Sequence, residues 1–591
     1  MSDIIFVVSY ILLVRACLGT GSFSGEGKSP MYGDFEAQRH WLEITSNLNI
    51  GDWYRHTKDN DLLYWGLDYP PLTAYVSWMF GKFASLPYIY PTMISLKTSR
   101  GIEDAICKTF MRISVILCDM ITFIPSMFYL SNNSIGLFVI SALNPALLLI
   151  DHGHFQYNGT CIGLAMLAIS NIDANYDVIG SILFCLSLNF KQISLYYAPI
   201  YFIILLRKCI LHSTTTATTT TTTVNFYYRN GFFHLTKIGL TVILTFGILW
   251  YPFCYYASTD ETCLSSLAHV LSRQFPFNRG IFEDKVANLW FCLSVLIDIR
   301  QYATVQMLAV GSLILTIILL LPVCYFTFFL VNIEQRDGIR AEIEEGIVKK
   351  KVQLNHYLTA LSASALAFFL ASFQVHEKSI LFALVPALLQ LRHDLLFCVW
   401  FQVIGVFSLV PLLIKDGHGV VGVVATLGIF ITLVIIDHVY NQTKENEEEI
   451  EEKIDYGNES GPKIDSTINR TSEDKDDIVI GNVTLSSSAS SFLASVESSV
   501  SSSTVMNNVF HCCFYLSAIC IIPLYLATLL VQPPARYPDL WPVLTAIVGA
   551  ACFLLAYLYQ INQLYIAYSS SFAHAHGGRS GSSIEIEKKK K

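Results

Sequence analysis

Polar residues that could do chemistry fall into four clusters within an otherwise apolar chain. The clusters are GDFEAQRHW at 33–41 together with LDYPP at 67–71, DHGHFQYN at 151–158, FPFNRGIFEDK at 275–285 and VHEKS at 375–379. Charges near membrane depth are costly, so they tend to face a cavity and mark a functional site. The clusters therefore predict a site of carboxylates, imidazoles and cations. Its candidates are Asp34, Glu36, Arg39, His40, Trp41, Asp68, Tyr69, His152, His154, Gln156, Tyr157, Asn158, Arg279, Glu283, Asp284, Lys285, His376, Glu377 and Lys378.

Each cluster also has a plainer explanation. The 33–41 cluster could be a solvated loop helix with interface anchors, and the 375–379 cluster an interfacial group of ions. His152 and His154 could bind a metal, but histidines two residues apart do not share a helix face. Hydrogen bonding to a substrate is therefore favoured over metal binding for this pair. Four such clusters in one hydrophobic chain favour a site over four separate structural features.

The elements that position these clusters are predicted from composition. The chain has 591 residues, 53% hydrophobic and 14% charged, whereas soluble domains have nearer a quarter charged residues. A helix needs about 20 apolar residues to cross a bilayer. Runs of that kind recur from residue 3 to residue 567, and several are too short to cross alone. We expect an all-α polytopic membrane protein with about 12–14 transmembrane helices.

Charge and cysteine usage exclude several classes of function. The net charge of −8 is concentrated between 441 and 480, where 13 acidic residues face 5 basic ones. The remainder is neutral overall, so a nucleic-acid-binding face is not supported. The 15 cysteines lie mostly within apolar runs without CxxC or Cys/His zinc spacing. A disulfide framework or a zinc site is therefore not expected.

Composition also divides the chain. We expect a membrane catalytic module at 1–440, a disordered acidic and Ser-rich insert at 441–505, transmembrane helices at 506–568 and a cytosolic tail at 569–591. The tail ends in four lysines, which resembles a dilysine retrieval signal of the endoplasmic reticulum. The Thr-rich stretch 214–223 is predicted to be disordered as well. The first apolar run, 3–19, is predicted to be retained as a helix, because no basic region precedes it.

The orientation is predicted from basic residues. Lys97, Arg100 and Lys108 follow the apolar run at 72–90. By the positive-inside rule this segment should be cytosolic, and the polar loop 20–71 should face the opposite compartment.

The carboxylate of Asp68 stands at the start of an apolar run for a physical reason. Pro70 and Pro71 cannot continue a helix from upstream, but they suit the first turn of a new one. Proline also pushes the residue before it, Tyr69, toward an extended backbone. The pattern therefore predicts that Asp68 is fixed just outside the bilayer, at the entrance of the helix that follows.

The quoted motifs, with WGLDYPPLTAY, FPFNRGIFEDKVANLW and VHEKSIL, resemble those of the dolichyl-phosphate-glucose-dependent α-1,3-glucosyltransferases of the endoplasmic reticulum. Within that group they are most similar to the enzymes that add the first glucose. The resemblance spans roughly residues 30–438, and the insert and the Thr-rich stretch depart from it. It implies a GT-C-type fold with luminal active-site loops, and a multi-pass location in the endoplasmic reticulum membrane. It also implies Asp68 as the catalytic base.

The resemblance further implies the substrates. The donor would be dolichyl-phosphate-glucose, and the acceptor the dolichyl-diphosphate-linked nine-mannose oligosaccharide. Direct displacement at the anomeric carbon inverts its configuration, so a β-linked donor gives an α-linked product with one carboxylate. A departing phosphate needs little protonation, so the expected helpers are cations, and we expect no metal or other cofactor. Arg279, Lys285, Lys378 and His376 are expected to bind phosphate; His152, His154, Gln156 and Asn158 are expected to bind sugar hydroxyls or phosphate.

Two questions stay open at this level. The runs 135–150 and 160–171 are short, so we expect a half-helix there to bring the 151–158 cluster to the lumen. The alternatives to first-glucose transfer are the sister enzyme that adds the second glucose and a polyprenyl-lipid or sugar transporter. Transporters usually show internal repeats with helices broken near the midplane, and no repeat is visible.

Overall fold

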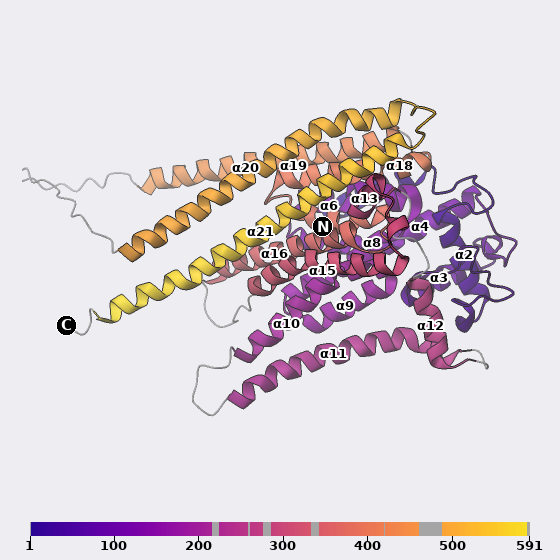
Figure 1. The fold of residues 1–591 in the computed structure, drawn as a ribbon, viewed down its shortest axis with the longest axis horizontal. Helices are drawn as coiled ribbons and strands as arrows, with labels where there is room; N and C mark the ends of the chain where they lie inside the picture. The colour runs from indigo at the N-terminus through magenta and orange to yellow at the C-terminus, as the bar shows by residue number, and fades with distance from the viewer. Residues whose placement is uncertain are drawn as a thin grey trace, which may run out of the picture.

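The structure is a computed structural model that describes residues 2–214, 224–257, 261–275, 285–331, 342–418, 420–459 and 487–587. The regular elements in these ranges are all helices (Figure 1). The helices up to residue 197, with one short helix near residue 378, are α1 (Ser2–Gly19), α2 (Asp34–Asn47), α3 (Pro71–Ala84), α4 (Ala105–Ile121), α5 (Phe123–Leu130), α6 (Ile135–Ala142), α7 (Pro145–Leu147), the π-helical η3 (Leu148–Phe155), α8 (Asn158–Asp173), α9 (Asp177–Phe190), η4 (Gln192–Tyr197) and η5 (Glu377–Ile380).

The remaining helices complete the bundle. They are α10 (Ala198–Thr214), α11 (Val224–Tyr255), α12 (Cys263–Gln274), α13 (Leu289–Leu296), α14 (Ile299–Tyr302), α15 (Val305–Leu330), α16 (Glu342–Ala371), α17 (Leu381–Leu388), α18 (Leu395–Lys415), α19 (Val420–Glu459), α20 (Ser487–Leu530) and α21 (Leu540–Glu587), with short 3-10 turns η1 (Ile50–Asp52) and η2 (Pro91–Ile94).

Ten segments in the described ranges are long and apolar enough to cross a membrane. The prediction of an all-α polytopic membrane protein is thereby confirmed, but this count is below the expected 12–14. Several predicted runs fold into shorter helices: α8 has 16 residues, α9 has 14 and α17 has 8. At 1.5 Å per residue, 16 residues rise only about 24 Å, which is less than the hydrocarbon thickness.

The segment before the 151–158 cluster is a single span rather than the expected half-helix. The stretch Ile135–Phe155 forms one candidate crossing of 21 residues, built from α6, α7 and η3. It ends where Phe155 takes a φ of 90°, an uncommon backbone conformation for a non-glycine residue. The next two helices form a hairpin, because Lys191 after α9 returns to within 2.6 Å of Asn158 at the start of α8. The cluster therefore lies at one end of the bundle without a half-helix.

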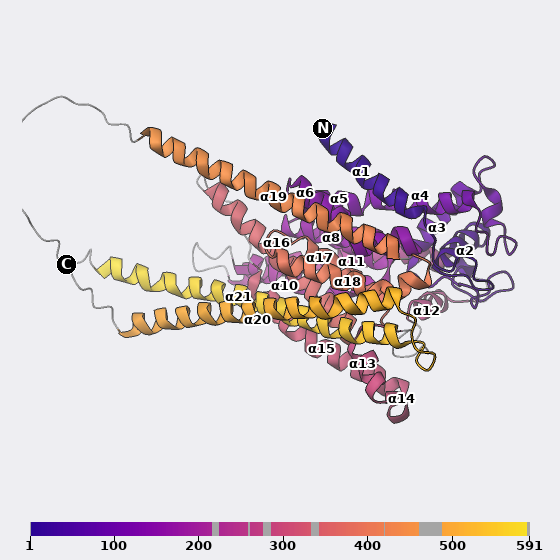
Figure 2. The same ribbon diagram turned by 90° about the horizontal axis from the view of Figure 1, so that it is seen from above.

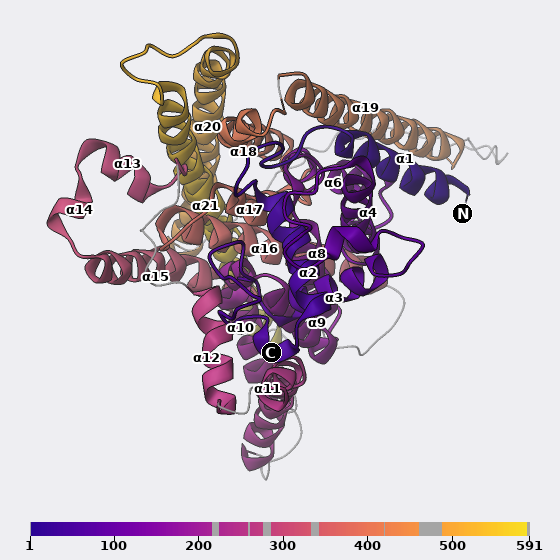
Figure 3. The ribbon, with the colours of Figure 1, turned by 90° about the vertical axis from the view of Figure 1, so that its right-hand side faces the viewer.

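The apolar run at 72–90 does not cross the membrane. Its helix α3 has 14 residues and packs along α2 at the end of the bundle that Figure 3 faces. The segment that follows stays at this end, since Lys97 Nζ lies 2.7 Å from Asp59 Oδ1. Arg39 Nη1 also donates to the carbonyl of Met93 at 2.7 Å. The prediction that Lys97, Arg100 and Lys108 lie on the side opposite loop 20–71 was therefore wrong. Lys108 Nζ lies 3.8 Å from Glu26 Oε1 and Arg100 lies over the ring of Tyr64, so all three cations contact that loop.

The C-terminal helices belong to the same packed body as the rest of the bundle (Figure 2). Trp400 Nε1 on α18 donates to Ser517 Oγ on α20 at 2.8 Å, and Gln560 Nε2 on α21 donates to Ser362 Oγ on α16 at 2.7 Å. The boundary predicted at 441 falls inside α19, and that at 505 inside α20. The centre of the insert (460–486), the Thr-rich stretch from 215 to 223 and the terminal lysines (588–591) lie outside the described residues.

One disulfide joins Cys254, near the end of α11, to Cys263, at the start of α12. Composition did not predict this bridge, because the two residues lack a recognisable spacing motif. The bridge lies at the end of the bundle that carries loop 20–71, since Arg55 Nε lies 3.1 Å from Glu261 Oε1.

Candidate active site

Three of the four sequence clusters meet at the carboxylate of Asp34, the first residue of α2. Its Oδ2 lies 2.9 Å from His154 Nε2, accepts from Gln156 Nε2 at 2.5 Å and lies 2.5 Å from Lys378 Nζ. The other imidazole nitrogen of His154 is bonded to Asp416, just after α18. Residues from distant parts of the chain thus form one polar centre at the end of the apolar bundle.

The LDYPP motif joins this centre through Tyr69. Its hydroxyl donates to Gln156 Oε1 at 3.2 Å, and its ring lies 4.8 Å from Lys191 Nζ. Lys191 also donates to Asn158 Oδ1 at 2.6 Å, and Asn158 Nδ2 in turn donates to Asp151 Oδ1 at 2.7 Å. A buried cation therefore sits between Tyr69 and the 151–158 cluster.

The backbone that carries Asp68 is held at successive carbonyl groups. Arg273 on α12 donates to the carbonyls of Gly66, at 2.8 Å, and Leu67, at 3.2 Å. Tyr54 Oη donates to the carbonyl of Tyr69 at 2.6 Å. Helix α3 begins directly after this segment at Pro71, as the two prolines predict. Asp68 itself is half-buried at the mouth of α3. Its own carbonyl accepts from Gln192 Nε2 on η4 at 3.4 Å, so three separate segments hold this backbone.

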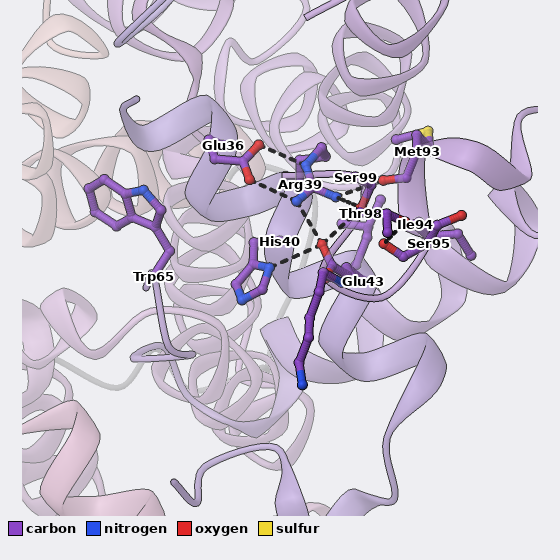
Figure 4. Close-up of polar contacts among 12 residues, drawn as sticks. Glu36, Arg39, His40, Glu43, Trp65, Met93, Ile94, Ser95, Thr98 and Ser99 are labelled. Carbon is purple, nitrogen blue, oxygen red and sulfur yellow. Dashed lines mark hydrogen bonds and ion pairs between the residues drawn. The ribbon is translucent and has the colours of Figure 1, made fainter. Parts of the chain in front are cut away.

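Residues 36–43 form a buried ion network behind this loop (Figure 4). Arg39 Nε and Nη2 each lie 2.7 Å from a Glu36 oxygen, and Nη2 lies 2.7 Å from Glu43 Oε2. Ser99 Oγ donates to Glu43 at 2.9 Å. Arg39 and Glu43 are fully buried. The polar atoms of Glu36 and Arg39 are thus bonded within the protein, which holds α2 against segment 85–104.

Three more predicted site residues have partners within the loop or the bundle. His40 Nδ1 lies 3.1 Å from Glu43, Trp41 Nε1 donates to the carbonyl of Trp65 at 2.9 Å, and Tyr157 Oη lies 2.6 Å from Ser114 Oγ. Through Trp65, Trp41 supports the segment that leads to Asp68. These contacts give the three residues positioning roles in this structure.

His152 lies apart from His154. Its Nε2 lies 2.9 Å from Asp119 Oδ2, which also lies 3.1 Å from Arg15 Nε on α1. The two histidines therefore face different carboxylates and cannot ligate one ion together. No group of three or more metal-ligating side chains occurs within the described ranges.

Of the remaining predicted residues, the structure brings some to the Asp34 centre and others not. Lys378 is in the centre, and His376 and Glu377 precede it at the start of η5, partly buried. Lys285 Nζ lies 2.9 Å from Asp539 Oδ1, in the connection between α20 and α21. Arg279, Glu283 and Asp284 lie outside the described residues.

The two lysines of the centre differ in the direction in which their pKa values are shifted. Burial alone would raise the pKa of Asp34, but Lys378 and His154 hold the pKa of this carboxyl well below its usual range. Burial would lower the pKa of Lys378, yet Asp34 and Glu377 raise it. Burial lowers the pKa of Lys191 to about 8, with nearby Lys378 adding to the shift. Lys378 is therefore neutralised by a neighbour, whereas Lys191 is a cation held in an unfavourable buried place.

Sequence reasoning missed Lys191, Arg273, Asp416 and Tyr54. Each is a single polar residue near a helix end, with no motif around it that points to a partner. Only the tertiary contacts bring them to the LDYPP segment and the Asp34 centre. Lys191 offered one usable signal, since it is a lone cation between two apolar runs.

Comparison with known proteins identifies the family of this chain. Residues 11–559 match the model of the ALG6, ALG8 glycosyltransferase family. A Dictyostelium discoideum relative, described as a probable dolichyl pyrophosphate Man9GlcNAc2 alpha-1,3-glucosyltransferase, is 39% identical over 75% of this chain and 79% of its own.

Two further relatives are described as dolichyl pyrophosphate Man9GlcNAc2 alpha-1,3-glucosyltransferase. That of Gallus gallus is 36% identical over 93% of this chain and 94% of its own. That of Saccharomyces cerevisiae is 34% identical over 96% of this chain and 92% of its own. The converging polar clusters, the helical membrane bundle and these matches together establish that the chain belongs to the ALG6, ALG8 glycosyltransferase family.

Proposed function

We propose that this protein transfers glucose from dolichyl-phosphate-glucose to the dolichyl-diphosphate-linked nine-mannose oligosaccharide, forming an α-1,3 linkage with inversion. The relatives' names support the acceptor and the linkage. The donor is proposed on chemical grounds, because a site with cations and a single base suits a phosphate leaving group.

The observation that carries this proposal is the meeting of Asp34, His154 and Lys378 beside the Tyr69–Gln156 contact. This centre adjoins the segment that carries Asp68, so a carboxylate and two buried lysines serve one site. A transporter would need a binding site near the midplane, whereas this centre lies at the end of span Ile135–Phe155.

Asp68 is the better of the two candidate bases. The lowered pKa of Asp34 makes that carboxylate a poor proton acceptor, and its Oδ2 is already engaged by Lys378. A general base works best when its pKa approaches the operating pH. In the proposed step, Asp68 accepts the proton of the acceptor hydroxyl, and the hydroxyl oxygen attacks the anomeric carbon. The bond from that carbon to the phosphate oxygen breaks, and dolichyl phosphate leaves with the electron pair.

The departing phosphate is stabilised by cations of the chain. Lys191 is a buried cation whose ammonium lies against the ring of Tyr69 in the LDYPP segment. Burial lowers the pKa of Lys191, and a bound phosphate would favour its charged form. Lys378 contributes through the Asp34 centre, and Arg279 is proposed as a third cation. This set needs no metal ion, since Lys and Arg alone can neutralise a phosphate.

We place the site in the lumen of the endoplasmic reticulum. The disulfide between Cys254 and Cys263 lies at the same end of the bundle as loop 20–71. Disulfides persist in oxidising compartments such as this lumen. The site would then act on lipid-linked sugars presented at the luminal face.

The test is an assay of the purified full-length protein with dolichyl-phosphate-glucose and the unglucosylated nine-mannose acceptor. The expected product is the singly glucosylated lipid-linked oligosaccharide with an α-linked glucose. Transfer only to an acceptor that already carries one glucose would assign the chain to the second-glucose step. Movement of either lipid across a bilayer without transfer would assign it to transport.

A further inference from the structure

A cavity with polar and apolar lining lies at the opposite end of the bundle from the Asp34 centre. It has a volume of about 440 Å³ and lies between α16, the start of α18, α20 and α21. Helix α18 separates the two places: Asp394 caps its first turn, while Asp416 after its last turn is bonded to His154. The 21 residues of α18 span about 30 Å. The cavity and the active site therefore lie at opposite faces of the membrane-spanning bundle.

The lining residues lie at the depth of lipid headgroups. Asn355 is near the start of span Gln353–Ala371, Phe397 near the start of Leu395–Lys415, and Asn507 near the start of Met506–Leu530. The α20 wall stands at the lipid boundary, since Met506 and Val509 beside it are 48% and 52% exposed. Headgroups and interfacial groups occupy this zone at the end of the hydrocarbon core.

The polar lining combines hydrogen-bond donors with one negative charge. The imidazoles of His356, His393 and His511 and the amide of Asn507 line the cavity. Among the lining residues that the structure describes, Asp394 is the one carboxylate. Its oxygens accept from Tyr559 Oη and, at 3.0 Å, from Phe397 N. A carboxylate has about four acceptor positions, so it retains capacity for a cation.

A second acceptor in the lining has no partner. Gln560 is 1% exposed, and its Nε2 donates to Ser362 at 2.7 Å. Its Oε1 is buried and accepts no hydrogen bond from any residue that the structure describes. A buried acceptor without a donor is costly. Gln560 Oε1 is itself buried away from the open space of the cavity, so the acceptor that a ligand meets there is Asp394.

We propose that this cavity binds the headgroup of a phospholipid with a primary ammonium group, of the phosphatidylethanolamine type. The ammonium supplies three N–H donors, and the carboxylate of Asp394 accepts from them. The phosphate accepts from the imidazole and amide N–H groups of the lining. Apolar lining from Phe397, Leu564 and Ile566 packs against the glycerol region. The cavity thus holds a lipid headgroup between helices, at the face of the bundle opposite the active site.

The test measures lipid retention by the purified, delipidated full-length protein with native mass spectrometry. Short-chain phosphatidylethanolamine, phosphatidylcholine and phosphatidic acid are added at equal concentration. Phosphatidylethanolamine should be retained about tenfold more than phosphatidylcholine, because the trimethylated ammonium has no N–H to donate. Equal retention of these two lipids, or a preference for phosphatidic acid, would overturn the proposal.

Variants locate the binding to this cavity. Asp394→Asn keeps an oxygen to cap α18 but removes the charge, and it should abolish the preference for the primary ammonium. His511→Phe keeps ring packing against Phe514 and Tyr559 and should weaken phosphatidylethanolamine binding several-fold. Asp437→Asn is the matched control, since Asp437 pairs with Arg392 and does not line the cavity.

A preference that persists in both cavity variants, with melting temperatures close to that of the parent, would place the lipid elsewhere and overturn the proposal. Should Asp394→Asn fail to fold, the response of His511→Phe alone decides the outcome.

Discussion

The ammonium of Lys378 lies 2.5 Å from Asp34 Oδ2, although the two residues are 344 positions apart. This contact joins the first helix of loop 20–71 to the turn before α17. It also lowers the pKa of Asp34, against the opposing effect of burial. The pairing makes Asp34 a poor proton acceptor, which is why Asp68 is proposed as the base.

Asp68→Asn should abolish transfer while donor binding persists. The change keeps the shape and most hydrogen bonds of the side chain but removes its ability to accept a proton. General-base catalysis is worth about 10²–10⁴-fold, so kcat should fall by that factor or more. The measurement is turnover with the nine-mannose acceptor, together with donor binding at equilibrium.

Asp34→Asn provides the comparison. It should reduce turnover by disrupting the Lys378 and His154 contacts, with a smaller loss in kcat than Asp68→Asn. An inactive Asp34→Asn beside a nearly normal Asp68→Asn would reassign the base to Asp34. Normal turnover in both variants would refute a carboxylate base altogether.

Lys191 should impose a pH dependence on use of the donor. Burial lowers its pKa to about 8, so its charge is present below that pH and is lost as the pH rises through it. A neutral amine binds phosphate poorly, so kcat/KM for the donor should fall above about pH 8. Lys191→Arg should extend the plateau to higher pH, because the guanidinium stays charged.

Lys191→Met should lose donor affinity below about pH 8, where Lys191 of the parent is charged, and should approach the parent above that pH. Lys97→Met is the control, since Lys97 pairs with Asp59 on the exposed side of the loop, and it should leave the profile unchanged. A parent-like pH profile in Lys191→Met would exclude Lys191 from phosphate binding.

Turnover should survive chelation. Cations of the chain, rather than a metal, are proposed to stabilise the phosphate, and His152 and His154 face different partners. The measurement is the rate of transfer in excess EDTA, with the metal content of the protein determined beforehand. A rate that collapses in EDTA and returns with manganese or magnesium would contradict the mechanism.

Glu43→Gln should destabilise the protein through its buried network. Burial raises the pKa of Glu43, but His40 and Arg39 outweigh it and lower the pKa to about 2, from a usual 4.5. The stabilisation is thus fully present above pH 4.5 and is lost as the pH falls toward 2. Removing one partner of a buried pair costs about 3–5 kcal/mol. Thermal unfolding in detergent at neutral pH measures the loss.

The control for this experiment is Asp59→Asn. That carboxylate is 51% exposed in its pair with Lys97, and exposed pairs contribute little to stability. Equal melting temperatures for the Glu43 variant and the parent would show that the network carries no stability.

Deletion of the insert centre and its flanks, roughly 445 to 503, should leave transfer nearly intact. An acidic, Ser-rich tract contributes little apolar surface to a core. The variant is compared with the parent for localisation, melting temperature and turnover. Loss of turnover by folded and correctly located protein would give the insert a functional role.

The sequence by itself determined the class of protein and the local devices of the site. Hydropathy alone indicates a helical membrane protein, because a bilayer leaves few alternatives to helices for satisfying the backbone. The two prolines predict the start of α3 at Pro71 and the extended segment that carries Asp68. The motifs also indicate which clusters belong together, since charges at membrane depth require a shared polar environment.

Only the tertiary structure decided how these pieces meet. Hydropathy identifies an apolar run but does not show whether the run crosses the bilayer. The run at 72–90 was therefore predicted to cross, whereas its helix α3 packs along α2. Charge counting also misplaced Lys97, because the rule applies to loops that flank a crossing helix, and the 14-residue α3 before Lys97 is not such a helix. Lys191, Arg273 and Asp416 reach the site through packing of elements far apart in sequence. Pairing of buried polar groups depends on three-dimensional neighbours, and no spacing along the chain specifies them.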